Sequence, residues 1–122
     1  MGSRAAEVLE GGIQTTVQDY PGRLGMLAQG FFPAGPMDHF ALRAANLLAG
    51  NDVAAAALEV TLGGLALRVD ADATVAVCGA ETELALGGNP AALWASHRIS
   101  GGTELRLGVS KGPGFRMYVA LS

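Results

Sequence analysis

Cysteine, histidine and charged side chains are all scarce in this chain of 122 residues. The single cysteine, Cys78, excludes an internal disulfide and is typical of a reducing, cytoplasmic setting. No apolar run approaches the ~20 residues that a membrane-spanning helix needs, so we expect no membrane partner. The length predicts one domain over residues 1–122.

Several kinds of site are excluded by what the chain does not contain. Charged residues make up 16% of it and the net charge is −3, without the basic patch that a nucleic-acid surface needs. His39 and His97 lie far apart and have no cysteine or carboxylate at ligand spacing, so we expect no metal; His97 is expected in a turn. No Gly-x-Ser-x-Gly elbow is present, and Cys78 in VAVCGA is predicted to be a buried core thiol.

Glycine is abundant, with 18 residues, which disfavours a helical bundle and predicts many tight turns. Short segments rich in Val and Leu follow one another at the spacing of a sandwich or barrel. Gly63-Gly64, Gly87-Gly88 and Gly101-Gly102 separate several of them. The predicted strands are Ala5–Leu9, Leu58–Leu62, Leu65–Val69, Thr74–Val77, Glu83–Leu86, Thr103–Leu107 and Phe115–Ala120, with a further short one near Leu27–Phe31. The fold class is therefore mainly β.

One amphipathic helix is predicted over Met37–Ala49, packed on or across the sheet. Asp38 is its expected N-cap and Gly50-Asn51 its stop. Its apolar stripe is expected to be Phe40, Ala44, Leu47 and Leu48, opposite His39, Arg43 and Asn46. Asp52 is expected to cap a second, very short helix that runs through Ala57.

The stretch GGIQTTVQDYPGRLG, Gly11–Gly25, is polar and Gly-rich, and we expect a long ordered loop there. Its amides, Gln14 and Gln18, can donate and accept, and Arg23 offers a planar fork for a carboxylate. The stretch could form a polar pocket, or Asp19 and Arg23 could pair and fix the loop. Residue types alone leave both alternatives open.

A second polar group raises the same question. Asn46 on the helix could bracket a loop, and Glu59 in ALEVT lies in an apolar context that requires a partner. With the loop, the candidates for a pocket or its support are Gln14, Gln18, Asp19, Arg23, Asp38, Arg43, Asn46 and Glu59. We expect the loop and the polar side of the helix to form one unit.

Four blocks, read in order, resemble a known family. They are GIQTTVQDYPGRLG, GFFPAGPMD, ANLLAGN and AALEVTLGG; VCGAE and FRMYVALS fit as well. The resemblance is to the biotin-dependent carboxyltransferases, which include allophanate hydrolase subunit 2, KipA-like proteins, 5-oxoprolinase subunits of the C type and the carboxyltransferase domain of urea carboxylase. Ala34-Gly35-Pro36 stands where the family has Ser-Gly-Ala, so no serine role is carried over, and Pro21 is an additional residue.

The resemblance implies a cyclophilin-like antiparallel β-barrel and a chain that is the N-terminal lobe of a longer subunit. It also implies a KipI-like or allophanate hydrolase subunit 1-like partner and contacts with a C-terminal lobe. No cofactor is expected on this chain, but carboxybiotin from a partner and ATP used by partner subunits are implied. In the carboxyltransferase, an amide nitrogen of a urea-like substrate captures the carboxyl group that carboxybiotin carries.

Two functions follow from this resemblance. The first is a lobe of an enzyme component, a carboxyltransferase or an amide hydrolase, that acts on a urea-like or cyclic amide substrate. The alternative is a KipA-like regulatory module that binds a partner subunit without catalysis. A lobe by itself would expose the apolar face that meets its other half, and we therefore expect inactivity and self-association of the isolated chain.

Overall fold

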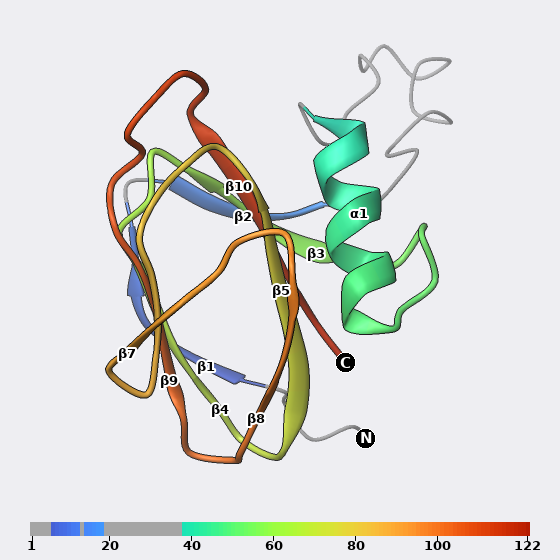
Figure 1. The fold of residues 1–122 in the computed structure, drawn as a ribbon, viewed down its shortest axis with the longest axis vertical. Helices are drawn as coiled ribbons and strands as arrows, with labels where there is room; N and C mark the ends of the chain where they lie inside the picture. The colour runs from blue at the N-terminus through green and yellow to red at the C-terminus, as the bar shows by residue number, and fades with distance from the viewer. Residues whose placement is uncertain (1–5, 13, 19–37) are drawn as a thin grey trace, which may run out of the picture.

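The computed structural model describes residues 6–12, 14–18 and 38–122, without the side chains of Gln14 and Gln18. These residues form ten β-strands and one α-helix, so the prediction of a mainly β fold with one helix is confirmed (Figure 1). Every strand pairing is antiparallel. In the described part the strands form two separate sheets, so the expected barrel is not one closed hydrogen-bonded ring.

The first sheet has the strand order β1-β4-β9-β6-β7. Its strands are β1 (Ala6–Gly11), β4 (Leu65–Val69), β9 (Glu104–Leu107), β6 (Leu84–Leu86) and β7 (Asn89–Ala91). The β6–β7 hairpin turns at Gly87 and Gly88, whose φ angles of 58° and 84° suit glycine in a two-residue hairpin turn. Pro90 cannot donate to a ladder, and it is tolerated because β7 is an edge strand.

The second sheet has the order β2-β3-β10-β5-β8. Its strands are β2 (Gln14–Gln18), β3 (Ala57–Thr61), β10 (Arg116–Leu121), β5 (Ala73–Gly79) and β8 (Ser96–Ile99). The helix α1 (His39–Ala49) lies against this sheet (Figure 1). One face of the second sheet therefore meets the interior and the other meets the helix.

Alternation along the strands makes two separate clusters of buried side chains. The larger lies between the sheets and includes Val60, Leu67, Val77, Leu105 and Met117. The smaller lies between α1 and the second sheet and consists of small side chains around Tyr118. Its members are Ala41, Leu42, Ala45, Ala49, Ala57, Ala76, Cys78, Tyr118 and Ala120. Cys78 is buried as predicted, and burial raises the pKa of its thiol from 9.0 to about 11.

The limits of α1 follow the predicted capping chemistry. The Asp38 carboxylate accepts a hydrogen bond from the Ala41 amide at 3.0 Å, as an N-cap does. Gly50 ends the helix in the left-handed region, with φ of 89°, and its amide donates to the carbonyls of Asn46 and Leu47. Both predicted ends of the helix are confirmed.

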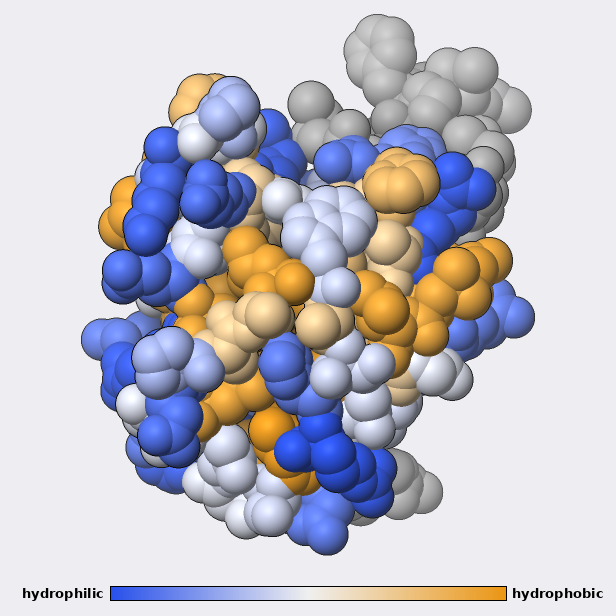
Figure 2. Space-filling model, viewed as in Figure 1, coloured by the Kyte–Doolittle hydropathy of each residue, from blue (hydrophilic) through white to orange (hydrophobic). Residues whose placement is uncertain are grey.

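The predicted apolar stripe of the helix is wrong. Phe40 is 68% exposed and Leu47 62% exposed, whereas the buried side is Ala41, Leu42, Ala45, Asn46 and Ala49. The reason is steric, because small side chains on both surfaces let the helix approach Ala57, Ala76 and Ala120 closely. Figure 2 shows apolar side chains exposed over this part of the molecule.

Three further predictions need correction. Gln14–Gln18 is a strand rather than a loop, because as an edge strand it needs only one neighbour, β3. Asp52 does not cap a helix; its carboxylate accepts from the Ala54 amide at 2.8 Å in a turn, and Ala57 already belongs to β3. His97 lies in β8 opposite Val75 rather than in a turn, because pairing with β5 overrides its local signal.

The remaining predicted strands correspond to observed strands whose ends shift by at most two residues, and Leu65–Val69 is reproduced without change. The predicted strand near Leu27–Phe31 lies outside the described residues. β7 and β8 were not predicted, because neither has the apolar alternation of a half-buried strand.

Candidate functional site

A buried chain of polar groups lies beneath the first turn of α1. The Tyr118 hydroxyl donates to Oε2 of Glu59 at 2.6 Å and accepts from the backbone amide of Asp38 at 2.8 Å. Tyr118 is fully buried and Glu59 is 7% exposed. Two of the predicted candidates, Asp38 and Glu59, are thus joined through a residue that was not among them.

Strand pairing explains this arrangement. Glu59 of β3 lies directly opposite Tyr118 of β10, on the face of the second sheet that α1 covers. Burial raises the pKa of the Tyr118 phenol well above its ordinary value, and the hydrogen bond to Glu59 raises it further. The phenol therefore stays protonated and serves as the donor that Glu59 requires.

Arg116 completes the cluster. It precedes Tyr118 by two residues on β10, so it shares that face of the sheet and lies diagonal to Glu59. Its Nε is buried 3.9 Å from Oε1 of Glu59, and the side chain as a whole is 34% exposed. Within the described part of the chain, Nε has no hydrogen-bond partner. A guanidinium carries five N–H donors, so this side chain has unused donor capacity.

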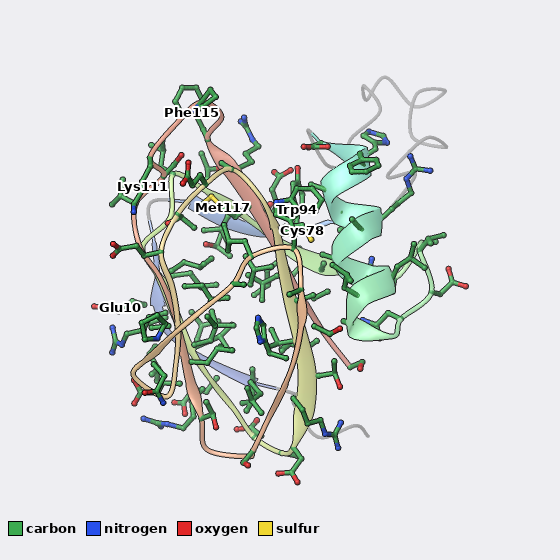
Figure 3. All side chains as sticks on the ribbon, viewed as in Figure 1. Glu10, Cys78, Trp94, Lys111, Phe115 and Met117 are labelled. Atoms are coloured by element: carbon green, nitrogen blue, oxygen red, sulfur yellow. The ribbon has the colours of Figure 1, made fainter. Side chains whose placement is uncertain are left out.

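A cavity of about 390 Å³ opens beside Arg116. The residues that line it come from the N-terminus of α1, the end of β5 and the loop before β10: Asp38, Gly79, Ala80, Pro113, Gly114, Phe115 and Arg116. In Figure 3, Phe115 lies on that loop while Cys78 and Trp94 lie closer to α1. Gly79 has no room for a side chain, because a Cβ would lie 2.4 Å from the Arg116 carbonyl oxygen.

The other candidates from the helix lie outside this cavity. Asn46 is fully buried; its Nδ2 donates to the Ala55 carbonyl at 2.7 Å, and its Oδ1 accepts from Asn51 at 3.4 Å. It is therefore the loop bracket that its residue type allowed, and its predicted place on the exposed stripe is wrong. Arg43 is half-buried and its Nε donates to the His39 carbonyl at 3.3 Å.

The candidates of the N-terminal stretch are only partly described. Strand pairing places Gln14 opposite Thr61 and Gln18 opposite Ala57, and their side chains lie outside the described residues. Asp19 and Arg23 lie outside them altogether.

Sequence reasoning missed Arg116 and Tyr118 as site residues. A signal was present, since Arg-x-Tyr in FRMYVALS places both side chains on one face of a strand. Only the pairing of β10 with β3 shows that this face carries Glu59.

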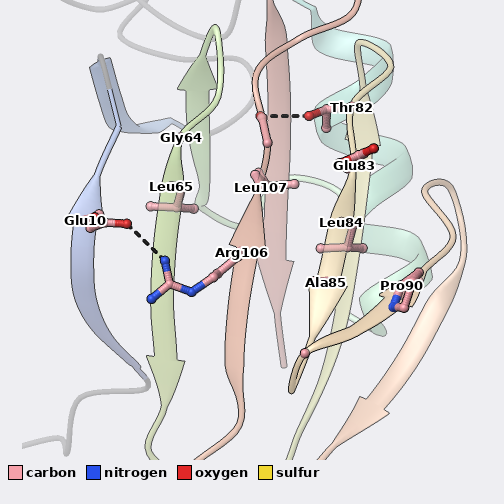
Figure 4. A pocket seen from close by; sticks show the side chains of 13 residues that line it. Glu10, Gly64, Leu65, Thr82, Glu83, Leu84, Ala85, Pro90, Arg106 and Leu107 are labelled. Carbon is pink, nitrogen blue, oxygen red and sulfur yellow. Dashed lines mark hydrogen bonds and ion pairs between the residues drawn. The ribbon is translucent and has the colours of Figure 1, made fainter.

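A larger hollow of about 620 Å³ lies at the first sheet (Figure 4). Its polar groups are already paired: Arg106 Nη1 lies 3.0 Å from Glu10 Oε2, and the Thr82 hydroxyl donates to the Gly108 carbonyl at 2.7 Å. The cavity at Arg116 is therefore the better candidate site, because its donors are not all used.

The described residues contain no group of three or more His, Cys, Asp or Glu side chains placed to hold a metal ion. Of the helices in the same part of the chain, none has the length and apolar character to span a membrane.

Two facing antiparallel sheets with one helix on the outer face, and a polar cluster at the helix N-terminus, define the class of domain. The family model for the carboxyltransferase domain, subdomain A and B, matches residues 29–122. The chain belongs to this carboxyltransferase family, as its motifs indicated.

Individual relatives agree with this assignment. The chain is 39% identical over 117 residues to the C-type subunit of 5-oxoprolinase from Escherichia coli K12, covering 95% of this chain and 37% of the relative. It is 36% identical over 117 residues to the urea amidolyase of Lachancea kluyveri, covering 96% and 6%. The crystal structure of the K. lactis urea amidolyase superposes with a TM-score of 0.91 at 37% identity, covering 96% of this chain and 7% of that one.

The chain therefore matches a segment of much larger proteins. It spans between 6% and 37% of the length of the curated relatives that it matches. It is a carboxyltransferase subdomain of the family that includes urea amidolyases and the C-type subunits of 5-oxoprolinase.

Proposed function

We propose that the chain is the N-terminal lobe of a biotin-dependent carboxyltransferase or 5-oxoprolinase component that acts on a urea-like or cyclic amide substrate. The observation that carries the proposal is the family match together with the cavity in which Arg116 has unused donors. The proposal also includes an allophanate hydrolase subunit 1-like (KipI-like) partner, a C-terminal lobe, partner subunits that use ATP, and a cytoplasmic location.

The residues at the cavity fit a ureido or lactam group. Such a group presents a carbonyl oxygen and an adjacent N–H; Arg116 offers donors and Asp38 an acceptor. Carboxybiotin from a partner would supply the carboxyl group. The part of this chain is to position the acceptor amide: Arg116 orients its carbonyl, and Glu59 with Tyr118 holds Arg116 in place.

Turnover by the complete protein with its partner subunits tests this function. We expect ATP-dependent consumption of either urea, with biotinylated carrier and bicarbonate, or 5-oxoproline. The same mixture without ATP is the control. Absence of turnover with both substrates, with all subunits folded and assembled, would overturn the enzymatic assignment.

The alternative is a KipA-like regulatory module, and exposed apolar side chains favour it. Phe40, Leu47 and Trp94 are 68%, 62% and 43% exposed, and the Phe40 and Trp94 rings lie 6.0 Å apart. Stable capture of the partner subunit without any turnover would support this alternative. Light scattering of the chain at micromolar concentration is expected to show self-association; a clean monomer would contradict it.

A further inference from the structure

We infer that the cavity between Asp38 and Arg116 selects a neutral cyclic amide, a ureido or lactam ring, and discriminates against the same ring bearing a carboxylate. The inference rests on the proposed function and makes its substrate class more specific. It depends on three features of the described residues: the unused donors of Arg116, the balance of charge around them, and the lining of the cavity.

The donors of Arg116 are held ready for a ligand. Glu59 lies 3.9 Å from Nε, beyond hydrogen-bond distance, and it is itself bound by the Tyr118 hydroxyl at 2.6 Å. The pair fixes the position of the guanidinium without using its hydrogen bonds. A planar fork of N–H groups suits a carbonyl oxygen or a carboxylate equally in geometry, so geometry alone does not choose the ligand.

Charge does choose between the two. Glu59 lies next to Arg116 and offsets its positive charge, and Asp38 places a further carboxylate on the lining. Within the described residues, no other cation lines the cavity. The set carries a net charge of about −1, which disfavours an entering anion at the separations that a cavity of this size allows. A neutral amide avoids this repulsion and gives Asp38 an N–H donor to accept.

The rest of the lining suits a small flat ring. Phe115, Pro113 and Ala80 are apolar, and Gly79 and Gly114 leave the backbone accessible. A volume of about 390 Å³ is at the lower end of the range for small-molecule sites, which fits a five-membered ring better than a long chain.

A matched pair of ligands tests the inference. 2-Pyrrolidinone and 5-oxoproline share the lactam ring and differ by one carboxylate; 2-imidazolidinone adds the cyclic urea. Each is titrated into the full 122-residue chain at pH 7, and the backbone amide signals of Gly79 and Gly114 and the Arg116 Nε–H signal are followed by NMR. We expect both neutral rings to shift these signals with millimolar affinity, and 5-oxoproline to bind about tenfold more weakly than 2-pyrrolidinone.

Substitutions make the test specific. Arg116→Gln should weaken binding of both neutral rings by about tenfold or more, whereas the matched Arg106→Gln on the first sheet should leave it unchanged. Asp38→Asn keeps an N-cap of equal quality and removes the charge, so it should reduce the preference for 2-pyrrolidinone over 5-oxoproline to about threefold or less.

Binding of 5-oxoproline as tight as that of 2-pyrrolidinone would overturn the selectivity. Equal effects of Arg116→Gln and Arg106→Gln, or no shift at Gly79, Gly114 and Arg116, would overturn the site. These outcomes are separate from the proposed function, because turnover by the complete protein with a substrate bound elsewhere would leave the enzymatic assignment intact.

Discussion

The outer faces of the two sheets solve the placement of charge in opposite ways. On the first sheet, Arg68 pairs with Glu7 and Glu104, and Arg106 pairs with Glu104 and Glu10, at 3.0–3.7 Å, with side chains 38–64% exposed. On the second sheet, α1 covers Glu59 and Tyr118. Water already solvates the charges of the first sheet, so their pairing contributes little.

Under α1 the same kinds of group lose water and depend on their partners. Such groups are also the ones that can hold a cation ready for a ligand, as Glu59 holds Arg116. The comparison therefore locates the site, and the predictions below test it from the largest expected effect to the smallest.

Removal of one buried carboxylate should show the contrast most clearly. Glu59→Ala leaves the Tyr118 hydroxyl without its acceptor and Arg116 without its counter-charge, so the free energy of unfolding should fall by about 3 kcal/mol. Glu104→Ala on the first sheet should change it by less than about 0.5 kcal/mol. Urea denaturation of both variants at pH 7 measures the difference, and similar losses would contradict the comparison.

Alkaline pH should weaken the helix-covered side. The pKa of Cys78 is raised in the folded chain from 9.0 to about 11, so its contribution is fully present below pH 9 and is lost as pH rises to about 11. The loss from this group is on the order of 2 kcal/mol. Cys78→Ala should flatten the decline between pH 9 and 11 in urea denaturation, leaving the part above pH 10 that the raised pKa of Tyr118 causes. An unchanged decline in Cys78→Ala would be inconsistent with this origin.

The buried amide of Asn46 should matter about as much as a strong hydrogen bond. Asn46→Ala leaves the Ala55 carbonyl without its donor, so the free energy of unfolding should fall by about 1–2 kcal/mol. Hydrogen exchange in residues 51–56 should rise more than in β4 of the first sheet. Uniform exchange changes across the chain would argue against the bracket role.

The N-cap should have the smallest effect of the four. Asp38→Ala should lower the free energy of unfolding by about 1 kcal/mol, because the Ala41 amide loses its acceptor, and Asp38→Asn should leave it nearly unchanged. Thermal denaturation of the two variants checks this. A large loss in both would show that the charge of Asp38, rather than its capping bond, stabilises the fold.

Local chemistry made much of the fold predictable. Gly63-Gly64 and Asp70 bound an apolar run, which gave Leu65–Val69 without error, and Asp38 and Gly50 marked the helix ends. The buried face of α1 was not predictable in this way, since the partners that favour Ala41 and Ala45 over Phe40 and Leu47 are alanines on distant strands.

The site was predictable only in part for the same reason. Asp38 and Glu59 were recognised as polar groups that needed an explanation. The residue that joins them, Tyr118, lies 59 positions after Glu59, and only the antiparallel pairing of β3 with β10 brings the two together. Arg116 shares that strand face, so it too becomes visible only when the pairing is known.

Turnover by the complete protein with its partner subunits, with Arg116→Gln compared with Arg106→Gln, tests the central claim most directly. The claim is that function lies on the helix-covered side of the second sheet. We predict that Arg116→Gln lowers kcat/KM by about 100-fold, because it removes a preorganised donor, while Arg106→Gln keeps nearly full activity. Full activity in Arg116→Gln, or an equal loss in both variants, would contradict the account.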